Sequence, residues 1–394
     1  STTMIINMLV FFFNGFSVGA GVIISRFYGA KDMSGLHRAV ETTMFVTFVF
    51  CVIFTILGIW LVRPMLLFMS TPEDVMEEAS VYLRIYFAGI TGLLIYNMGS
   101  GILRAVGDTR RPLLFLIFTS LMNVVLDLVF VLVFHMGIAG VAYATIISQF
   151  LSAGLILLLL HSPKEICYFR FRELCCDSRI LKDVFQIGLP AAIQAVVTSF
   201  SNVFVQSYIN KFGSAVMAGW SCYNKLDSFI MLPMSSIAQA ATTFVGQNIG
   251  AGKKDRVNKG TVQSLILVEA VTFFMALGLY VYAGPATGIF TSDQAVIGAG
   301  VLFMRTNVFF MLLNCANHTL AGALRGRGDS TGPMIIMLTS YVAVRQVYLF
   351  IMTRYIRNVP KTVGFGYPVG WMVCFVLEIG YFYFRWGRER TERA

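Results

Sequence analysis

The chain has 394 residues, of which 57% are hydrophobic and only 13% are charged, and its mean hydropathy is +0.74. This composition lies far outside that of soluble globular domains, so it excludes a soluble protein and indicates a chain that crosses a membrane several times. The net charge is +10, from 30 Lys and Arg against 20 Asp and Glu, and such an excess is typical of proteins that bind nucleic acid or membranes.

Apolar runs long enough to cross a bilayer recur along the whole chain. A spanning helix needs about 20 apolar residues, and unbroken runs favour helices over the alternating pattern of barrel strands. Eleven transmembrane helices are therefore predicted, at residues 4–25, 39–62, 80–103, 113–134, 137–160, 184–209, 226–247, 261–284, 296–322, 333–356 and 364–386. The fold class is an all-α polytopic membrane protein.

The basic residues gather in every second connection between these helices. The clusters lie at residues 26–38, 104–111, 164–182, 253–259, 325–327 and 385–393. The connections between them are neutral or acidic, apart from the basic segment 354–361. This is the positive-inside pattern, so we expect a multi-pass plasma-membrane protein with a cytoplasmic C-terminus. Its partner is then the lipid bilayer and not nucleic acid.

Two nearly identical stretches organise the chain. GILRAVGDTRRP begins at Gly101 and GALRGRGDSTGP at Gly322, 221 residues later, and the same shift pairs Pro64 with Pro285. An internal duplication follows, which predicts two parallel repeats of six helices. We assign residues 1–160 to an N-terminal lobe, 161–183 to a cytoplasmic linker and 184–394 to a C-terminal lobe.

The two repeats differ in their number of predicted helices. Parallel repeats need an even number each, yet the first has five and the second six, because the span 184–209 has no counterpart. We expect one further helix to precede this sequence. A family that naturally has eleven spans is the alternative.

Each stretch contains an LRxxGD motif, at Leu103–Asp108 and at Leu324–Asp329. The doubled motif, with Gly29–Asp32 followed by His37 and Arg38, resembles the multidrug and toxic compound extrusion (MATE) transporters. The resemblance covers essentially the whole chain. It implies two six-helix lobes around a cavity that opens alternately to each side, and export of amphipathic or cationic small molecules against a gradient of H+ or Na+. We expect a monomer that is not an enzyme and needs no cofactor.

The motif residues also have a physical interpretation as structural hinges. Gly107 and Asp108 can turn the chain where a helix ends, while Arg104 places positive charge beside the last carbonyls of that helix. The equivalent hinge residues in the second copy are Arg325, Gly328 and Asp329.

Asp127 is the strongest candidate for a cation-coupling site. It lies deep in the predicted span 113–134, one turn after Asn123 on the same face, and ionisable residues inside membranes are functional by default. Asp127 could carry a proton, or bind Na+ with the oxygens of Asn123 and Thr145. In the DinF-like branch of the family, an Asn and an Asp four apart on the fifth helix and a Thr on the sixth form the cation site. Asn97 resembles a polar residue of the same pocket.

This site departs from the family pattern in one respect and has one alternative interpretation. The family's further acidic ligand lies on the first helix, so the site is incomplete within this sequence. The structural alternative is that Asp127 only links neighbouring helices. Transition-metal binding is not predicted, since the seven cysteines show no metal-site spacing.

Other buried charges are predicted at Glu269, Arg345 and Glu378. Either acid could line the cavity and attract a cationic substrate, or could pair with Arg345, the interpretation that we favour. The acidic positions of the NorM-like branch correspond to Thr198 and Asn314, which argues against second-lobe coupling of that kind.

These features predict a secondary active antiporter that exports drugs and toxins by alternating access. One alternative is a lipid-linked saccharide flippase of the same superfamily, whose cavity would need several cations, whereas only Arg345 lies deep enough. The other is a truncated, inactive membrane scaffold.

Overall fold

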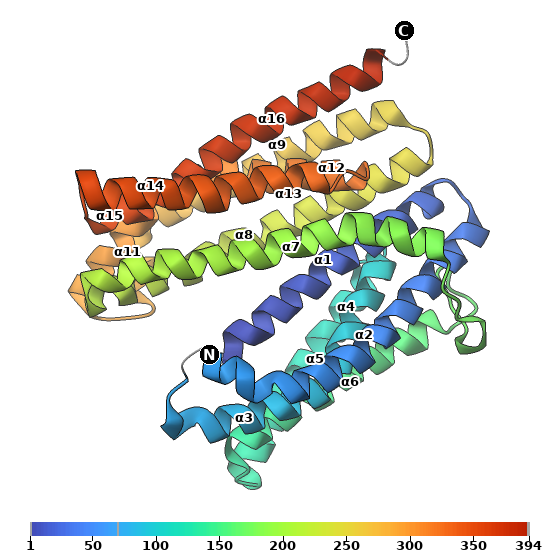
Figure 1. Ribbon diagram of the computed structural model, residues 1–394, viewed down its shortest axis with the longest axis horizontal. Helices are drawn as coiled ribbons and strands as arrows, with labels where there is room; N and C mark the ends of the chain where they lie inside the picture. Colours follow the sequence, from blue (N-terminus) through green and yellow to red (C-terminus); the bar gives the residue numbers. More distant parts are fainter. Residues whose placement is uncertain (1, 69–70, 392–394) are drawn as a thin grey trace. The chain divides into compact units, whose positions relative to one another are not determined.

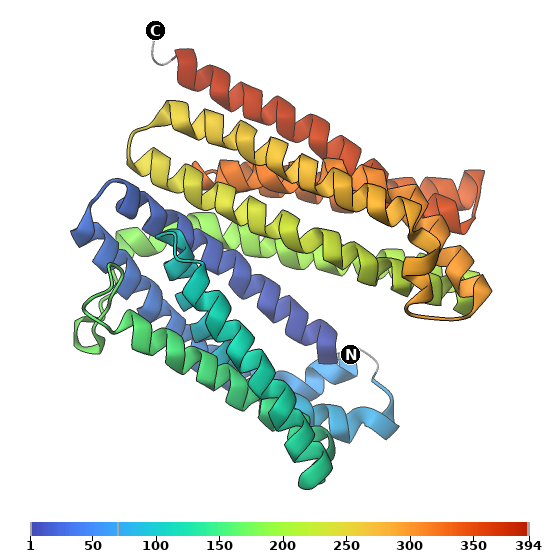
Figure 2. The same ribbon diagram turned by 180° about the vertical axis from the view of Figure 1, so that it is seen from behind.

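The computed structural model describes residues 2–68 and 71–391, and every regular element within these ranges is helical. Ten helices in this part of the chain are long and apolar enough to cross a membrane, and a bent pair makes an eleventh. The predicted all-helical fold with eleven spans is therefore confirmed. The chain divides into two compact units, Ser1–Ala192 and Ile193–Ala394, whose helices Figures 1 and 2 show from opposite sides.

Unit 1 is built around α4, which packs against α1, α2 and α6, while α6 also packs against α5. Its elements are α1 (Thr2–Gly29), α2 (Met33–Phe68), α3 (Glu73–Ala88), α4 (Ile90–Ala105), α5 (Arg110–Leu128), η1 (Val129–Val133), α6 (Gly137–Leu160), η2 (Phe171–Glu173) and the first part of α7 (Ser178–Ile209).

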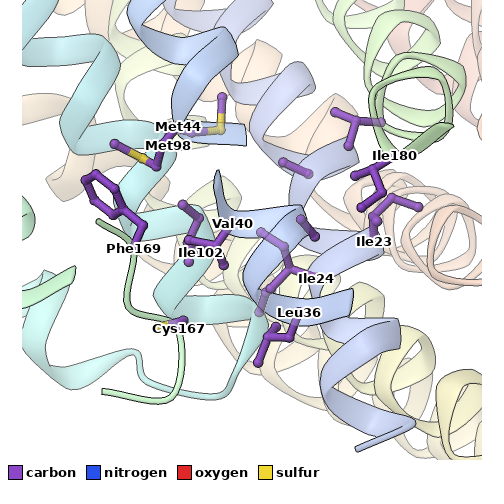
Figure 3. Packing of buried hydrophobic residues seen from close by; sticks show 14 of the residues in the cluster. Ile23, Ile24, Leu36, Val40, Met44, Met98, Ile102, Cys167, Phe169 and Ile180 are labelled. Carbon is purple, nitrogen blue, oxygen red and sulfur yellow. The ribbon is translucent and has the colours of Figure 1, made fainter. Parts of the chain in front are cut away.

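The core of unit 1 lies between α1, α2, α4 and the segment that follows α6 (Figure 3). Ile24, Leu36 and Ile102 are completely or almost completely buried there. Phe169 and Cys167, from the predicted linker 161–183, are also buried in this core. The segment after α6 therefore contributes apolar side chains to unit 1.

Unit 2 is built around α12, which packs against α8, α9 and α16. Its elements are the rest of α7, η3 (Asn210–Phe212), α8 (Ser214–Gly250), α9 (Lys254–Val281), α10 (Ala283–Gly288), α11 (Gln294–Asn307), η4 (Val308–Phe310), α12 (Met311–Gly326), α13 (Thr331–Leu338), η5 (Thr339–Val344), α14 (Arg345–Ile351), η6 (Met352–Ile356), α15 (Pro360–Gly364) and α16 (Gly366–Thr391).

The internal duplication is visible in the positions where the helices break. α3 and α4 meet at Gly89 with a bend of 48°. In unit 2 the equivalent helices α11 and α12 are separated by η4, at Val308–Phe310. The break therefore recurs at the 221-residue shift found in the sequence.

Both LRxxGD motifs end a helix with the same backbone turn. Asp108 N donates to Leu103 O at 2.9 Å and Gly107 N to Arg104 O at 3.0 Å. This is the Schellman arrangement, which needs a left-handed residue after the helix, and the φ angle of Gly107 is +96°. Arg104 lies in the last turn of α4.

The second copy repeats these contacts. Asp329 N donates to Leu324 O at 3.0 Å and Gly328 N to Arg325 O at 2.8 Å, and the φ angle of Gly328 is +88°. Each motif aspartate also caps the helix that follows, since Asp108 Oδ1 accepts from Arg111 N at 3.2 Å and Asp329 Oδ1 accepts from Gly332 N at 3.0 Å.

Two side chains of α16 also donate hydrogen bonds to Asp329. Its Oδ2 accepts hydrogen bonds from Tyr381 Oη at 2.5 Å and from Arg385 Nη2 at 2.7 Å. Partial burial acts in the opposite direction, but these hydrogen bonds lower the pKa of Asp329 below its ordinary value of 3.8. Asp329 thus joins the start of α13 to the end of α16.

We expect Gly107→Ala and Gly328→Ala each to lower the free energy of unfolding by about 1–2 kcal/mol, the cost of a side chain in the left-handed region. Gly154→Ala in α6 is the matched control, because a Cβ there meets nothing within 4 Å and the backbone φ is not positive. Thermal unfolding in detergent measures the difference. Equal stability of Gly328→Ala and Gly154→Ala would contradict the assigned turn.

We expect Asp329→Asn to lower the melting temperature at neutral pH. A carboxyl group with a lowered folded-state pKa stabilises the fold above its unfolded pKa, and this contribution is lost as the pH falls through the folded value. The difference between wild type and Asp329→Asn should therefore shrink as the pH falls below the ordinary value of 3.8. Asp74→Asn, at an exposed position in α3, serves as control. A pH-independent difference would show that the ionised carboxylate is not what matters.

Candidate functional site

A hydrogen bond between two hydroxyl groups sets the register of α5 against α6. Ser152 Oγ donates to Thr119 Oγ1 at 2.7 Å. The two helices are consecutive and antiparallel, so each turn forward on α5 faces one turn backward on α6. Asn123 therefore lies level with Ser148, and Asp127 lies level with Thr145. We call this line of contact between α5 and α6 the polar seam.

Four polar atoms of the polar seam are buried and, among the described residues, have no hydrogen-bond partner. They are Asn123 Nδ2, Asp127 Oδ1, Ser148 Oγ and Gln149 Oε1. Buried polar groups in proteins are almost always hydrogen-bonded, and an unpaired one costs about 1–3 kcal/mol, or more if it is charged. Three of the four, the oxygens of Asp127, Ser148 and Gln149, are acceptors that a bound proton or cation can satisfy, whereas Asn123 Nδ2 is a donor.

Two further features surround Asp127. Its carboxylate acts electrostatically on the phenol of Tyr82, which α3 brings to this region by packing against α6. The regular α-helix ends at Leu128, one residue after Asp127, and continues as the π-helical segment Val129–Val133. Such π-helical turns occur frequently at functional sites, so the backbone also departs from regularity beside the carboxylate.

The other predicted ligands are partly engaged. Thr145 Oγ1 donates to Val141 O at 2.9 Å, and Asn97 Nδ2 donates to Leu93 O at 2.9 Å. Each keeps its side-chain oxygen as an acceptor. Sequence reasoning missed Ser148 and Gln149, although they follow Thr145 by three and four residues and so share its helix face.

The polar seam can hold a proton or a hard cation. Asp127 alone suffices for a proton, whereas carboxylate, carboxamide and hydroxyl oxygens are the donors that hard cations prefer. Within residues 2–68 and 71–391, no group of three or more His, Cys, Asp or Glu residues could hold a metal ion. The donor set therefore suits H+ or Na+.

In the part of the chain that the structure describes, Arg345 forms no ion pair with an acid, so the expected pairing is not seen. Its side chain is only 2% exposed. Nη2 donates to Ser201 Oγ at 2.7 Å, and the guanidinium stacks 4.7 Å from the ring of Tyr367. A hydroxyl group and an aromatic face thus contact the guanidinium, while its buried Nε has no hydrogen-bond partner among the described residues. Neither Glu269 nor Glu378 contacts it within ion-pair distance in the described part of the chain.

Glu269 lies at the wall of an apolar groove in unit 2. α9 and α16 both pack on α12, and the groove over α12 has a volume of about 310 Å³. Its lining includes Leu265, Leu320 and Phe375 beside the carboxylate, which is half-buried near the middle of α9. The groove combines an apolar wall with one acidic group.

Glu378 lies elsewhere, in the middle of α16, and its side chain is fully buried. Thr198 and Asn314 are also in unit 2, where Asn314 Oδ1 accepts a hydrogen bond from Tyr341 Oη at 2.7 Å. Asp127, Glu269 and Glu378 therefore occupy three separate places, and a further acid, Asp227, lies in the spanning helix α8, where its Oδ1 accepts a hydrogen bond from Tyr223 Oη at 3.3 Å.

Comparisons with known proteins agree with this architecture. The family model described as MatE matches residues 1–129 and 190–351. A probable multidrug resistance protein of Bacillus subtilis, YpnP, is 29% identical over 99% of this chain and 86% of its own length. A second one from that organism, YoeA, is 26% identical over 98% of this chain and 85% of its own length.

Solved structures show the same fold. A multidrug resistance MATE family transporter of the MOP superfamily, in an outward-facing conformation, matches with a TM-score of 0.91 at 22% identity, over 100% of this chain and 87% of that one. A MATE structure in a bent conformation gives a TM-score of 0.92 at 21% identity, over 99% and 87%. The chain belongs to the MATE family and is a membrane-spanning transporter rather than an enzyme.

Proposed function

We propose that this transporter is a secondary active antiporter, which exports small amphipathic or cationic compounds in exchange for H+ or Na+. The observation that carries the proposal is the polar seam, where one oxygen of the Asp127 carboxylate, Oδ1, and two neutral acceptor oxygens are buried without partners among the described residues. The names of the relatives as multidrug resistance proteins support the class of substrate.

Ion loading can drive a conformational change at this seam. An empty carboxylate favours hydration, whereas a protonated or sodium-bound one tolerates burial between α5 and α6. A ligand shifts a conformational equilibrium only if it binds the two conformations with different affinities. Here the difference in affinity comes from the different burial of the carboxylate in the two conformations. A membrane potential of 100 mV gives about 2.3 kcal/mol per net charge moved, enough for a roughly fiftyfold concentration difference of a neutral substrate for each ion exchanged.

The proposal includes the organisation of the chain in the membrane. The lobes are residues 1–160 and 184–394, joined by the linker 161–183, and the transporter acts as a monomer because the duplication supplies both lobes in one chain. The motif turns at Gly107 and Gly328 serve as hinges between rigid helices. The distribution of basic residues supports a plasma-membrane location with a cytoplasmic C-terminus.

The Glu269 groove supports the cationic character of the substrate. Ligand sites combine an apolar wall with a few well-placed polar groups, and a volume of about 310 Å³ lies at the lower end of their usual range. A carboxylate on an apolar wall attracts a molecule with a hydrophobic body and one positive charge. We assign this groove to lipophilic cations.

We expect Asp127→Asn to abolish gradient-driven efflux of a cationic dye from proteoliposomes, because the amide neither titrates nor neutralises a sodium ion. Asp74→Asn, at the exposed start of α3, should transport as wild type does. Dye binding to the purified variant should persist, which separates coupling from folding. Unchanged efflux by Asp127→Asn would remove this residue from the coupling step.

The neighbouring oxygens distinguish the two ions in the same assay. Gln149→Leu and Ser148→Ala remove acceptors that a sodium ion would use and a proton would not. If sodium couples transport, both variants should need at least about tenfold more Na+ for half-maximal efflux, the loss expected from 1.4 kcal/mol of binding energy. If protons couple it, their efflux should follow the wild-type dependence on the pH gradient.

We expect Glu269→Gln to weaken binding of tetraphenylphosphonium by about tenfold, since a partly buried charge pair contributes on the order of 1–2 kcal/mol. Binding of a neutral amphiphile of similar size should be unchanged. Leu320→Trp, which fills the groove, should weaken both. Equal affinity of wild type and Glu269→Gln for the cation would place the substrate elsewhere.

A further inference from the structure

Glu378 is a fully buried acid that no part of the proposed coupling uses. It stands in the middle of α16, its side chain is 0% exposed, and among the described residues neither Oε1 nor Oε2 has a hydrogen-bond partner. No Lys, Arg or His nitrogen described here lies within ion-pair distance of it. An ionised carboxylate without partners in such a place is among the most costly arrangements in a protein.

Among the described residues, the positive charge that acts on this carboxylate is Arg325 of the second LRxxGD motif. Arg325 attracts the carboxylate electrostatically from α12, but its Nη2 donates instead to Gln194 Oε1 on α7, at 2.7 Å. Its Nε is buried and has no partner among the described residues. The guanidinium is thus held on one side by an amide and attracted toward an acid on the other.

The remaining groups around Glu378 do not replace Arg325. Tyr341 from η5 and Cys374 from α16 itself interact with the carboxylate electrostatically, and His318 on α12 experiences the charge of Arg325. Arg345, at the start of α14, is engaged by Ser201 and Tyr367. α13 and η4 carry no charged residue, and Lys361 of α15 lies in a separate pocket with Arg305.

Arg325 can therefore take two arrangements, which depend on the protonation of Glu378. While Glu378 is a neutral acid, Arg325 remains bonded to Gln194, as in this structure. When the proton leaves, the new negative charge attracts Arg325, so the guanidinium is drawn from α7 toward α16. Because Arg325 lies three residues before Gly328, the exchange acts directly on the turn between α12 and α13.

We propose that Glu378 is a proton-binding site in unit 2, whose ionisation transfers Arg325 from Gln194 to α16. The site goes beyond the proposed coupling at Asp127 and is independent of it. At the shift of 221 residues, Glu378 corresponds to Leu157 in the first repeat, and Asp127 corresponds to Tyr348 in the second. Each repeat therefore carries an acid that the other lacks.

Infrared difference spectroscopy of the reconstituted transporter tests the proposal without measuring transport. Lowering the pH from about 9 to about 5 should produce the carbonyl band of a buried protonated carboxyl group. Part of the band should be lost in Glu378→Gln, and that part should be retained in Asp127→Asn and Glu269→Gln, which remove only their own contributions. A wild-type band of equal intensity at both pH values, or a pH-dependent band whose intensity is the same in wild type and Glu378→Gln, would overturn the proposal.

A second pair of variants keeps the test decisive if Glu378→Gln folds poorly. Arg325→Gln removes the compensating cation, so the midpoint of protonation should move to higher pH by about one unit or more. Gln194→Leu releases the guanidinium toward α16 and should move the midpoint to lower pH. Midpoints that stay at the wild-type value in both variants would show that Arg325 does not respond to Glu378.

Discussion

Hydrocarbon offers no hydrogen-bonding partner, and the structure depends on how this constraint is met. The backbone meets it because every regular element in the described ranges is helical, with turns at the helix ends closed by their own hydrogen bonds. Side chains meet it less completely. Some polar atoms, such as Asp127 Oδ1 and Glu378 Oε1, are buried without a partner among the described residues. A bound ion or proton can complete the bonding of such an atom.

The same constraint explains why the two motif copies agree in backbone but differ in side-chain contacts. The Schellman turns at Gly107 and Gly328 satisfy helix-end carbonyls, which both repeats require equally. The aspartates then cap the next helix in the same way but are held by different cations. Arg111 bridges Asp108 to Glu165, whereas Arg385 reaches Asp329 from α16. Duplication preserved the turn, and each copy acquired its own means of holding it.

The fold was largely predictable, because long apolar runs and the 221-residue repeat depend on local composition and on self-similarity. The prediction for the polar seam was partial. Asn123 and Asp127 share a face by their spacing, but Ser148 and Gln149 enter only through the register that Ser152 and Thr119 set between two helices. The pairing of Arg345 with an acid failed for a related reason. Charge in a sequence suggests opposite charge as its partner, while the structure uses a hydroxyl group and an aromatic ring.

The two repeats share their helices but not their acids, and this asymmetry bears on how a duplicated transporter can move. If both units carried the same carboxylate in equivalent places, one ion would bias both in the same way. Asp127 instead lies between α5 and α6, away from the motif turn, whereas Glu378 acts on Arg325, within the motif itself. In the proposed scheme, an ion bound in unit 1 changes helix packing, and a proton bound in unit 2 changes the turn that joins α12 to α13. The duplication gives two units with similar helices. On these proposals, their buried acids lie at nonequivalent positions, so the two units respond differently to ion binding.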